Sequence, residues 1–169
     1  MKPLATDHPE YFTKYINLVP EDEILTAFKT QLPLVTARLG SISEKNAAYS
    51  YAPGKWTIKE LLQHIIDTER MFMFRSLAIA RKETAVLPSF DENAYASASD
   101  ANRRTWNELI NEFITLRQST TNLFESFTPS MINQSGKAAS GNTTVNSLGF
   151  IIAGHVYHHL NVIKEKYNM

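Results

Sequence analysis

Apolar residues recur every three or four positions in four long stretches of the chain, which is the spacing of amphipathic helices that each bury one face. The first stretch begins around Pro20–Glu23, where acidic residues suit the positive end of a helix dipole, and Pro33 inside it predicts a kink. The second begins at Thr57, which can form a capping box with Glu60, and extends to about Arg81. The first half of the chain therefore predicts two long helices.

The second half of the chain carries two more helical stretches. Thr105 and Glu108 form another capping-box motif, and apolar residues follow at helical spacing as far as Phe127. The last helix runs from about Thr144 to Tyr167, close to the end of the chain. A shorter helical segment is expected near residues 10–17, ahead of the first long helix.

Four long helices without any segment of strand periodicity predict an all-α fold. We expect a four-helix bundle with long connecting loops that forms a single domain over residues 1–169. The two long connections are residues 82–104 and 128–143, which are rich in Ser, Asn, Ala and Pro. Connections of this length are uncommon in compact domains and are often functional, and disorder is the alternative interpretation.

Composition narrows the chemistry that the chain can perform. Its 17 basic and 17 acidic residues balance, so no overall charge draws the protein to nucleic acid or to an anionic membrane. The absence of cysteine excludes disulfides, thiolate metal sites and a catalytic cysteine, so metal ligands must be His, Asp or Glu. No apolar run is long enough for a secretion signal or a membrane span, and we expect a cytoplasmic protein.

Two of the five histidines lie in the middle of an apolar helix face. At about 100° per residue, His155 and His159 lie about 20° to either side of Leu148, whereas His158 lies about 80° from it, at the edge of the stripe. A single histidine on such a face is usually a hydrogen-bonded core residue. Two imidazoles stacked one turn apart among apolar neighbours would be costly to bury, and one metal ion could bind both.

His64 flanks the apolar stripe of the second long helix and could point into the bundle towards the same ion. Its alternative interpretation is an interfacial histidine that hydrogen-bonds to Glu60 or Asp67 on its own helix. Three neutral imidazoles suit Zn, Ni or Fe(II) better than Mg or Ca. Three protein ligands also leave coordination positions open, as in catalytic rather than structural sites.

Glu69 is the second anomaly, because it falls inside the apolar face of the second long helix. One hypothesis makes it a partner of a metal-bound histidine or a proton acceptor in catalysis. The alternative interpretation is a salt bridge to a neighbouring helix, or a side chain that extends out to the solvent. His8 lies in a polar terminus and carries no functional signal.

Three segments together resemble the DinB-like superfamily. They are YAPGKWTIKELLQHIIDTER at residues 51–70, PSFDENAY at 88–95 and IIAGHVYHHL at 151–160. The resemblance extends from the YINLVP segment to the terminal HHLNVIKEKY, so it covers nearly the whole chain. It is nearest to the YfiT-type branch of metal-dependent hydrolases and bacillithiol transferases.

The resemblance implies an antiparallel four-helix bundle that is commonly dimeric. In this family a histidine of the second helix and an H-x-x-x-H pair of the last helix hold the metal, and these positions correspond to His64, His155 and His159. His158 does not match a ligand position. Relatives use the open metal face for transfer of a low-molecular-weight thiol or for thiol-dependent isomerisation.

The leading functional hypothesis is therefore a divalent-metal-dependent thiol S-transferase. The metal would lower the pKa of a small thiol cosubstrate, and the thiolate would attack an electrophile. The alternatives are a metal-dependent hydrolase that activates water and a non-catalytic metal-binding module. The expected partners are a small-molecule thiol, an electrophile and a second copy of the chain, with neither nucleic acid nor a membrane.

Overall fold

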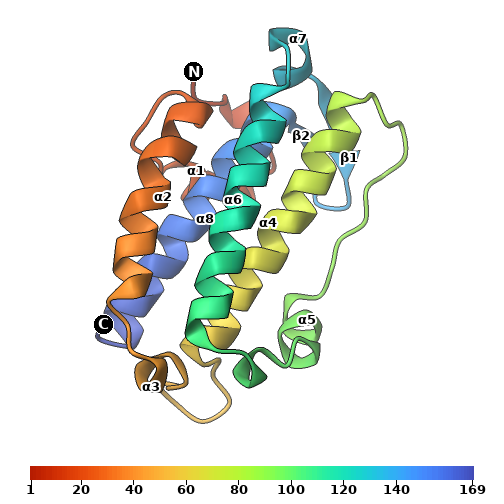
Figure 1. The fold of residues 1–169 in the computed structure, drawn as a ribbon. Coiled ribbons are helices and arrows are strands. Elements are labelled where there is room, and N and C mark those ends of the chain that lie inside the picture. Colours follow the sequence, from red (N-terminus) through yellow and green to blue (C-terminus); the bar gives the residue numbers. More distant parts are fainter.

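Four long helices pack side by side in the computed structural model, which describes residues 1–169, and shorter elements cover both ends of the bundle (Figure 1). The predicted all-α four-helix bundle is thus confirmed, and the predicted helix ends agree to within about two residues. The long helices are α2 (Ile24–Gly40), α4 (Ile58–Ala80), α6 (Trp106–Glu125) and α8 (Val145–Lys166).

The helix directions explain the longest connection. α2 and α8 run one way and α4 and α6 the other, so that α4 is antiparallel to α8 but parallel to its other neighbour, α6 (Figure 1). The side chain of Lys59 at the start of α4 donates to the carbonyl of Arg104, just before α6, at 2.6 Å. Because α4 is about 35 Å long, residues 82–104 must return along the whole bundle before α6 can begin. Topology therefore requires this long connection.

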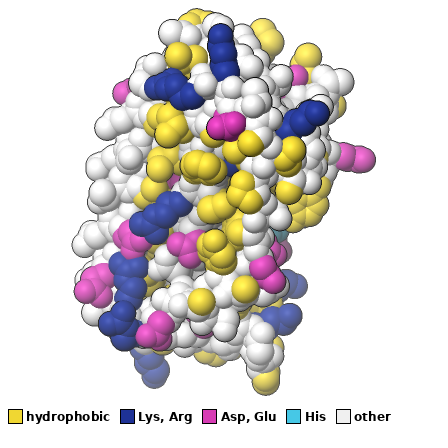
Figure 2. Space-filling view, turned by 90° about the vertical axis from the view of Figure 1, so that its right-hand side faces the viewer, with side chains coloured by type: hydrophobic (Ala, Val, Ile, Leu, Met, Phe, Trp, Pro, Cys, Tyr) yellow, Lys and Arg dark blue, Asp and Glu magenta, His cyan; other side chains and the backbone are white.

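One side of α4 is not covered by another long helix. Apolar side chains gather across this face of the molecule (Figure 2). Phe74 and Leu77 of α4 and Val86 of the segment that follows it are exposed apolar residues. Since large side chains of this kind are normally buried, this face is a candidate contact surface.

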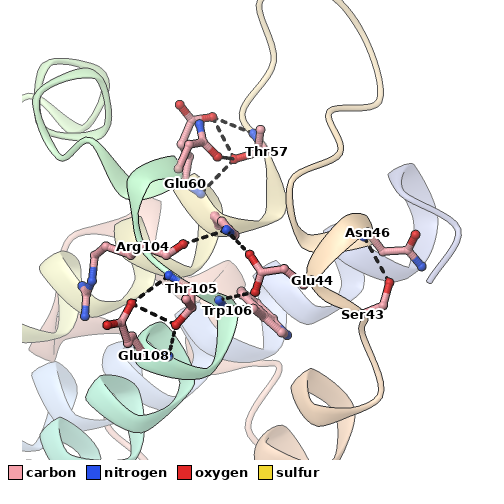
Figure 3. Close-up of polar contacts among 11 residues, drawn as sticks. Ser43, Glu44, Asn46, Thr57, Glu60, Arg104, Thr105, Trp106 and Glu108 are labelled. Carbon is pink, nitrogen blue, oxygen red and sulfur yellow. Dashed lines mark hydrogen bonds and ion pairs between the residues drawn. The ribbon is translucent and has the colours of Figure 1, made fainter.

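Capping interactions fix where α4 and α6 begin, as the sequence predicted (Figure 3). The Glu60 carboxylate accepts the Thr57 N–H at 2.7 Å, and the Glu108 carboxylate accepts the Thr105 N–H at 2.8 Å. Glu44 adds a third partner, because its carboxylate accepts the N–H of Trp106 at 2.7 Å. The starts of both helices are therefore held by satisfied backbone donors.

Short elements make up the rest of the chain. The predicted helical segment near residues 10–17 forms a 3₁₀ turn followed by α1, and α2 continues as one helix through the exposed Pro33. The short elements are η1 (Ala5–Asp7), η2 (Glu10–Phe12), α1 (Thr13–Ile16), α3 (Glu44–Ala47), α5 (Glu92–Ala98), η3 (Ala101–Arg103), α7 (Pro129–Ile132), β1 (Ser135–Ala138) and β2 (Gly141–Thr144).

The antiparallel hairpin of β1 and β2 was not predicted, because its four-residue strands contain little apolar alternation. It holds the long connection in place: the Leu87 N–H donates to Lys137 O, and the Ala139 N–H donates to Leu87 O, both at 2.9 Å. Gly136 lies so close to Ile79 at the end of α4 that a Cβ atom there would come within 2.6 Å of it. The hairpin therefore attaches residues 82–104 to α4.

A buried polar layer divides the bundle core into two apolar clusters. One cluster of 20 buried residues lies towards the end that holds the hairpin, and one of 17 lies towards α3. Between them the long helices contribute polar side chains that are almost fully buried. They are Gln31 of α2, His64, Thr68 and Glu69 of α4, Arg117 and Thr120 of α6, and His155 of α8.

Arg117 is at the centre of this layer and is completely buried. Its Nε and Nη2 donate to the two carboxylate oxygens of Glu69 at 2.9 and 2.8 Å, and its Nη1 donates to the side-chain oxygen of Gln31 at 2.5 Å. The amide nitrogen of Gln31 donates in turn to Ala153 O of α8 at 2.8 Å. One hydrogen-bonded chain thus connects all four long helices.

None of the helices combines the length and the apolar composition that crossing a membrane would require.

We expect Arg117→Met to destabilise the fold by about 3–5 kcal/mol, because it leaves the Glu69 carboxylate buried without its cation. Adding Glu69→Met should recover a large part of that loss, since the double variant has no unpaired buried charge. Urea unfolding followed by circular dichroism measures both effects. Lys29→Met is the control, because it breaks the exposed ion pair with Glu125 and should cost about 1 kcal/mol or less. Equal losses for Lys29→Met and Arg117→Met would contradict the prediction.

Candidate metal centre

Three imidazoles from two antiparallel helices converge in the middle of the bundle. His64 comes from α4, and His155 and His159 come from successive turns of α8. The cap at Thr57 sets the start of α4, while the four-residue spacing in α8 puts two rings on one face. His64 and His155 are buried, and His159 is partly exposed. The structure therefore brings together the three histidines that the sequence singled out.

The distances between the ring nitrogens fit one shared ion. The Nε2 atom of His155 lies 3.1 Å from Nε2 of His64 and 2.9 Å from Nε2 of His159. Two nitrogen ligands of a tetrahedral zinc ion, each about 2.0–2.1 Å from the metal, lie about 3.3 Å apart. One potential ligand atom from each histidine lies within 4.8 Å of the other two. The geometry thus suits a divalent ion with three nitrogen ligands.

Burial keeps these imidazoles in the neutral form that metals bind. Desolvation, followed by the charge of His158, lowers the pKa of His64 to about 4. Desolvation and the neighbouring imidazoles hold the pKa values of His155 and His159 well below the ordinary range. The Nδ1 atom of His159 is buried without a hydrogen-bond partner, so the protein itself does not satisfy this cluster completely. At neutral pH the three rings offer lone pairs and no positive charge.

Aromatic rings enclose the cluster. Tyr15 of α1 packs edge-on against His155, with ring centroids 5.6 Å apart, and Trp56 lies 4.9 Å from the ring of His64. Tyr15 can come this close because the residue before His155 is glycine. A Cβ atom on Gly154 would lie 2.0 Å from the Tyr15 carbonyl oxygen. Gly154 thus allows the backbone of α1 to pack directly on α8 beside the cluster.

Two cavities adjoin the three histidines. The first has a volume of about 170 Å³, is reached by His64 and His155, and extends along α4 as far as Arg75. Segment 89–92 of the long connection, carried there by the hairpin, lines it as well. The second has a volume of about 230 Å³ and contains His159, Trp56 and Asn93. Glu92 of α5 lines the first cavity and its neighbour Asn93 lines the second, so this short helix lies over the candidate centre.

The remaining candidate residues take other roles in the structure. Glu69 makes its ion pair with Arg117 and accepts a hydrogen bond from Thr120 at 2.8 Å, and it forms no hydrogen bond with a histidine. It therefore forms the salt bridge to a neighbouring helix that was the alternative interpretation. His158 packs on Tyr15 and lies outside the three-histidine cluster. His8 is buried, although its terminus was expected to be polar, and it lies outside the cluster as well.

Sequence reasoning missed three residues of the site: Tyr15, Trp56 and Arg75. Tyr15 and Trp56 lie outside the long helices, and no local pattern relates them to the histidines. Arg75 did carry a signal, because it lies three residues after Phe72 and four before Ile79, on the buried face of α4. A charged residue in such a position requires a partner or a function.

Known proteins share both the sequence pattern and the fold. The chain matches the DinB superfamily over residues 27–163, a range that includes all three histidines of the cluster. It is 29% identical over 145 residues to a protein of Oceanobacillus iheyensis that is provisionally named a metal-dependent hydrolase. That alignment covers 79% of this chain and 80% of the relative.

Two solved structures have similar folds. One is YfiT from Bacillus subtilis, provisionally described as a metal-dependent hydrolase with an unusual four-helix bundle topology. It has a TM-score of 0.68 at 18% identity, over 99% of this chain and 94% of YfiT. The other is a mycothiol-dependent maleylpyruvate isomerase, with a TM-score of 0.68 at 13% identity, over 85% of this chain and 60% of the isomerase. At these identities the two likenesses concern the fold.

Removing any one of the three clustered imidazoles should weaken metal binding. We expect wild-type protein to accept about one Zn²⁺ or Ni²⁺ ion per chain, and His64→Ala, His155→Ala and His159→Ala each to lower the affinity at least tenfold. His158→Ala is the matched control and should retain the metal. Isothermal titration with circular dichroism on the same samples separates lost ligands from lost fold. Unchanged affinity in all three variants would refute the site.

Acid should destabilise the metal-free protein. In the unfolded chain a histidine gains its proton below about pH 6.5, whereas folded His64 stays neutral down to about pH 4. The unfolded state therefore binds more protons between these values, and the free energy of unfolding decreases as the pH falls through this interval. Urea unfolding at pH 7.5, 6 and 5 should give a steeper slope for wild type than for His64→Gln. Parallel profiles would contradict the linkage.

Proposed function

The chain belongs to the DinB superfamily, and on that basis we propose that it is a divalent-metal-dependent enzyme. The observation that carries this proposal is the convergence of three neutral imidazoles on one point beside a cavity. His64, His155 and His159 would hold the ion. Nitrogen ligands without thiolate or carboxylate favour Zn, Ni or Fe(II) over Mg or Ca.

Three ligands leave at least one coordination position for a substrate. A bound ion would lower the pKa of a thiol or a water molecule in that position. Tyr15 and Trp56 would shield the imidazoles from water, because their rings pack against His155 and His64. The Thr68 hydroxyl lies 3.5 Å from the Nδ1 atom of His64, where it can orient the ring. The cavity of about 170 Å³ provides room for a small substrate.

We favour transfer of a low-molecular-weight thiol to an electrophile. A thiol is far more acidic than water, with a pKa of about 8.5 against 15.7, so it is the easier of the two to ionise at neutral pH. In this reaction the sulfur forms a bond to an electrophilic carbon of the second substrate, the bond between that carbon and its leaving group breaks, and the leaving group departs as an anion while the thiol proton is released to water. The chain contains no cysteine, so the thiol must be a cosubstrate. The mycothiol dependence of one structural neighbour is consistent with this chemistry.

A metal-dependent hydrolase is the second candidate. The provisional names of the Oceanobacillus iheyensis relative and of YfiT favour it, and the same three ligands would serve it. The third candidate is a module that binds metal without catalysis. The three possibilities differ in what they do with thiols and with activated esters.

We also propose that the protein forms a homodimer in the cytoplasm. The resemblance to the family suggests the dimer, and the exposed Phe74, Leu77 and Val86 are its candidate contact surface. Neither nucleic acid nor a membrane is proposed as a partner, because the formal net charge is zero and no helix could span a bilayer.

Cobalt-substituted protein should distinguish the enzyme classes. If a thiol enters the coordination sphere, adding a small thiol such as 2-mercaptoethanol should produce an intense sulfur-to-cobalt absorption band. The same protein should consume a monochlorobimane-type electrophile only when a thiol is present, and chelation should abolish the reaction. His155→Ala serves as the control without a complete site, and His158→Ala as the control that retains one.

Thiol-independent cleavage of activated esters, together with no spectral response to any small thiol, would instead establish the hydrolase. A bound metal without turnover in either assay would favour the non-catalytic module.

A further inference from the structure

Arg75 is a buried cation without a counterion in the cavity that adjoins the candidate centre. Its side chain is almost fully buried, and it lines the same cavity as His64 and His155. Its Nη2 atom donates to the carbonyl oxygen of Pro88 at 2.6 Å, which is its single hydrogen bond, and its Nε atom is buried without a partner. A guanidinium has five N–H donors, so four remain unused.

Arg117, the other buried arginine of the bundle, has the carboxylate partner that Arg75 lacks. Arg117 has a bidentate carboxylate partner in Glu69 and an amide partner in Gln31. Arg75 makes no ion pair with any carboxylate of the chain, and Phe72 covers one face of its guanidinium at 5.2 Å. A buried cation that lacks a counterion is costly, because the lost hydration is not replaced. A structural role in holding Pro88 would need only the one N–H that is already used.

The surroundings of Arg75 favour an anion. Glu92, which also lines the cavity, is exposed, so water screens its charge, whereas the Arg75 side chain is almost fully buried and makes no ion pair with Glu92. Guanidinium groups match the planar geometry of carboxylates and bind them through two parallel hydrogen bonds. We propose that Arg75 binds a carboxylate group of the substrate and so makes the enzyme selective for anionic thiols or electrophiles.

The position of Arg75 also sets the length of this substrate. Arg75 and His64 are eleven residues apart, which corresponds to about 16 Å along the axis of α4. Side chains on a helix lean towards its N-terminus, and because the arginine side chain is longer than that of histidine, the guanidinium reaches back towards the histidines and shortens the gap. A ligand that reaches both must carry its carboxylate several bonds away from its reacting atom. The identity of that atom as sulfur rests on the proposed function, whereas the role of Arg75 does not.

Matched pairs of thiols test the proposal. Binding of 6-mercaptohexanoate and of 6-mercaptohexanol to cobalt-loaded protein can be followed by the absorption of the thiol-bound ion. The affinity of wild type for 6-mercaptohexanoate should exceed its affinity for 6-mercaptohexanol by about tenfold or more, because the carboxylate adds a charge-assisted bidentate contact. Arg75→Gln should lose this preference while keeping its affinity for the alcohol, and Arg75→Lys should keep part of it.

Arg81→Gln is the matched control, because it removes the same charge at the exposed end of α4 and should preserve the preference. A preference that survives in Arg75→Gln, or no preference in wild type, would overturn the proposal. If Arg75→Gln fails to fold, the comparison of Arg75→Lys with wild type decides in its place.

A second measurement is independent of metal and thiol. The Arg75 Nε–H signal of ¹⁵N-labelled, metal-free protein, identified by its absence in Arg75→Lys, should shift when hexanoate is added and stay unchanged with hexanol. A shift with hexanoate but no thiol response in the cobalt protein would support Arg75 and count against the thiol reaction. An unchanged signal with hexanoate would count against Arg75 whatever the reaction proves to be.

Discussion

The arrangement of the bundle depends on the ion pair between Arg117 and Glu69 in its centre. Both groups are buried, so each would be strongly destabilising without the other. Gln31 extends the pair to α2 and, through the carbonyl oxygen of Ala153, to α8. A shift of any one of these helices by a turn would break at least one of these bonds. The network therefore selects one register of the four helices, in addition to any stability that it contributes.

The same register aligns the three clustered histidines. Glu69 lies five positions after His64 on α4, which at about 100° per residue turns their side chains about 140° apart. Glu69 therefore meets α6 while His64 meets the histidine pair of α8. Ala153, whose carbonyl oxygen ends the network, lies two residues before His155. A shift of one turn in either helix would break the polar network and separate the imidazoles, so the two groups are positioned together.

The parallel arrangement of α4 and α6 has a functional consequence. It requires residues 82–104 to cross the length of the bundle, and the hairpin holds this connection at Leu87. The residues that follow, Ser89, Phe90 and Glu92, then line the cavity beside the histidines. The wall of the candidate site is thus built from a segment whose length the topology demands. Neutral imidazoles of α4 and α8 and the unpaired cation of Arg75 line the same cavity.

The sequence alone determined the features that depend on neighbours within one or two helical turns. The four long helices, the caps at Thr57 and Thr105 and the common face of His155 and His159 follow from local hydrogen bonding and from the 3.6-residue repeat. Tertiary structure decided which distant residues meet. Glu69 finds Arg117 48 positions away, and His64 finds His155 91 positions away. The role of Arg75 likewise depends on tertiary packing, and so do those of the hairpin and the long connection. What a buried charge or a short polar strand does is decided by the residues that it contacts, and no local pattern identifies those residues.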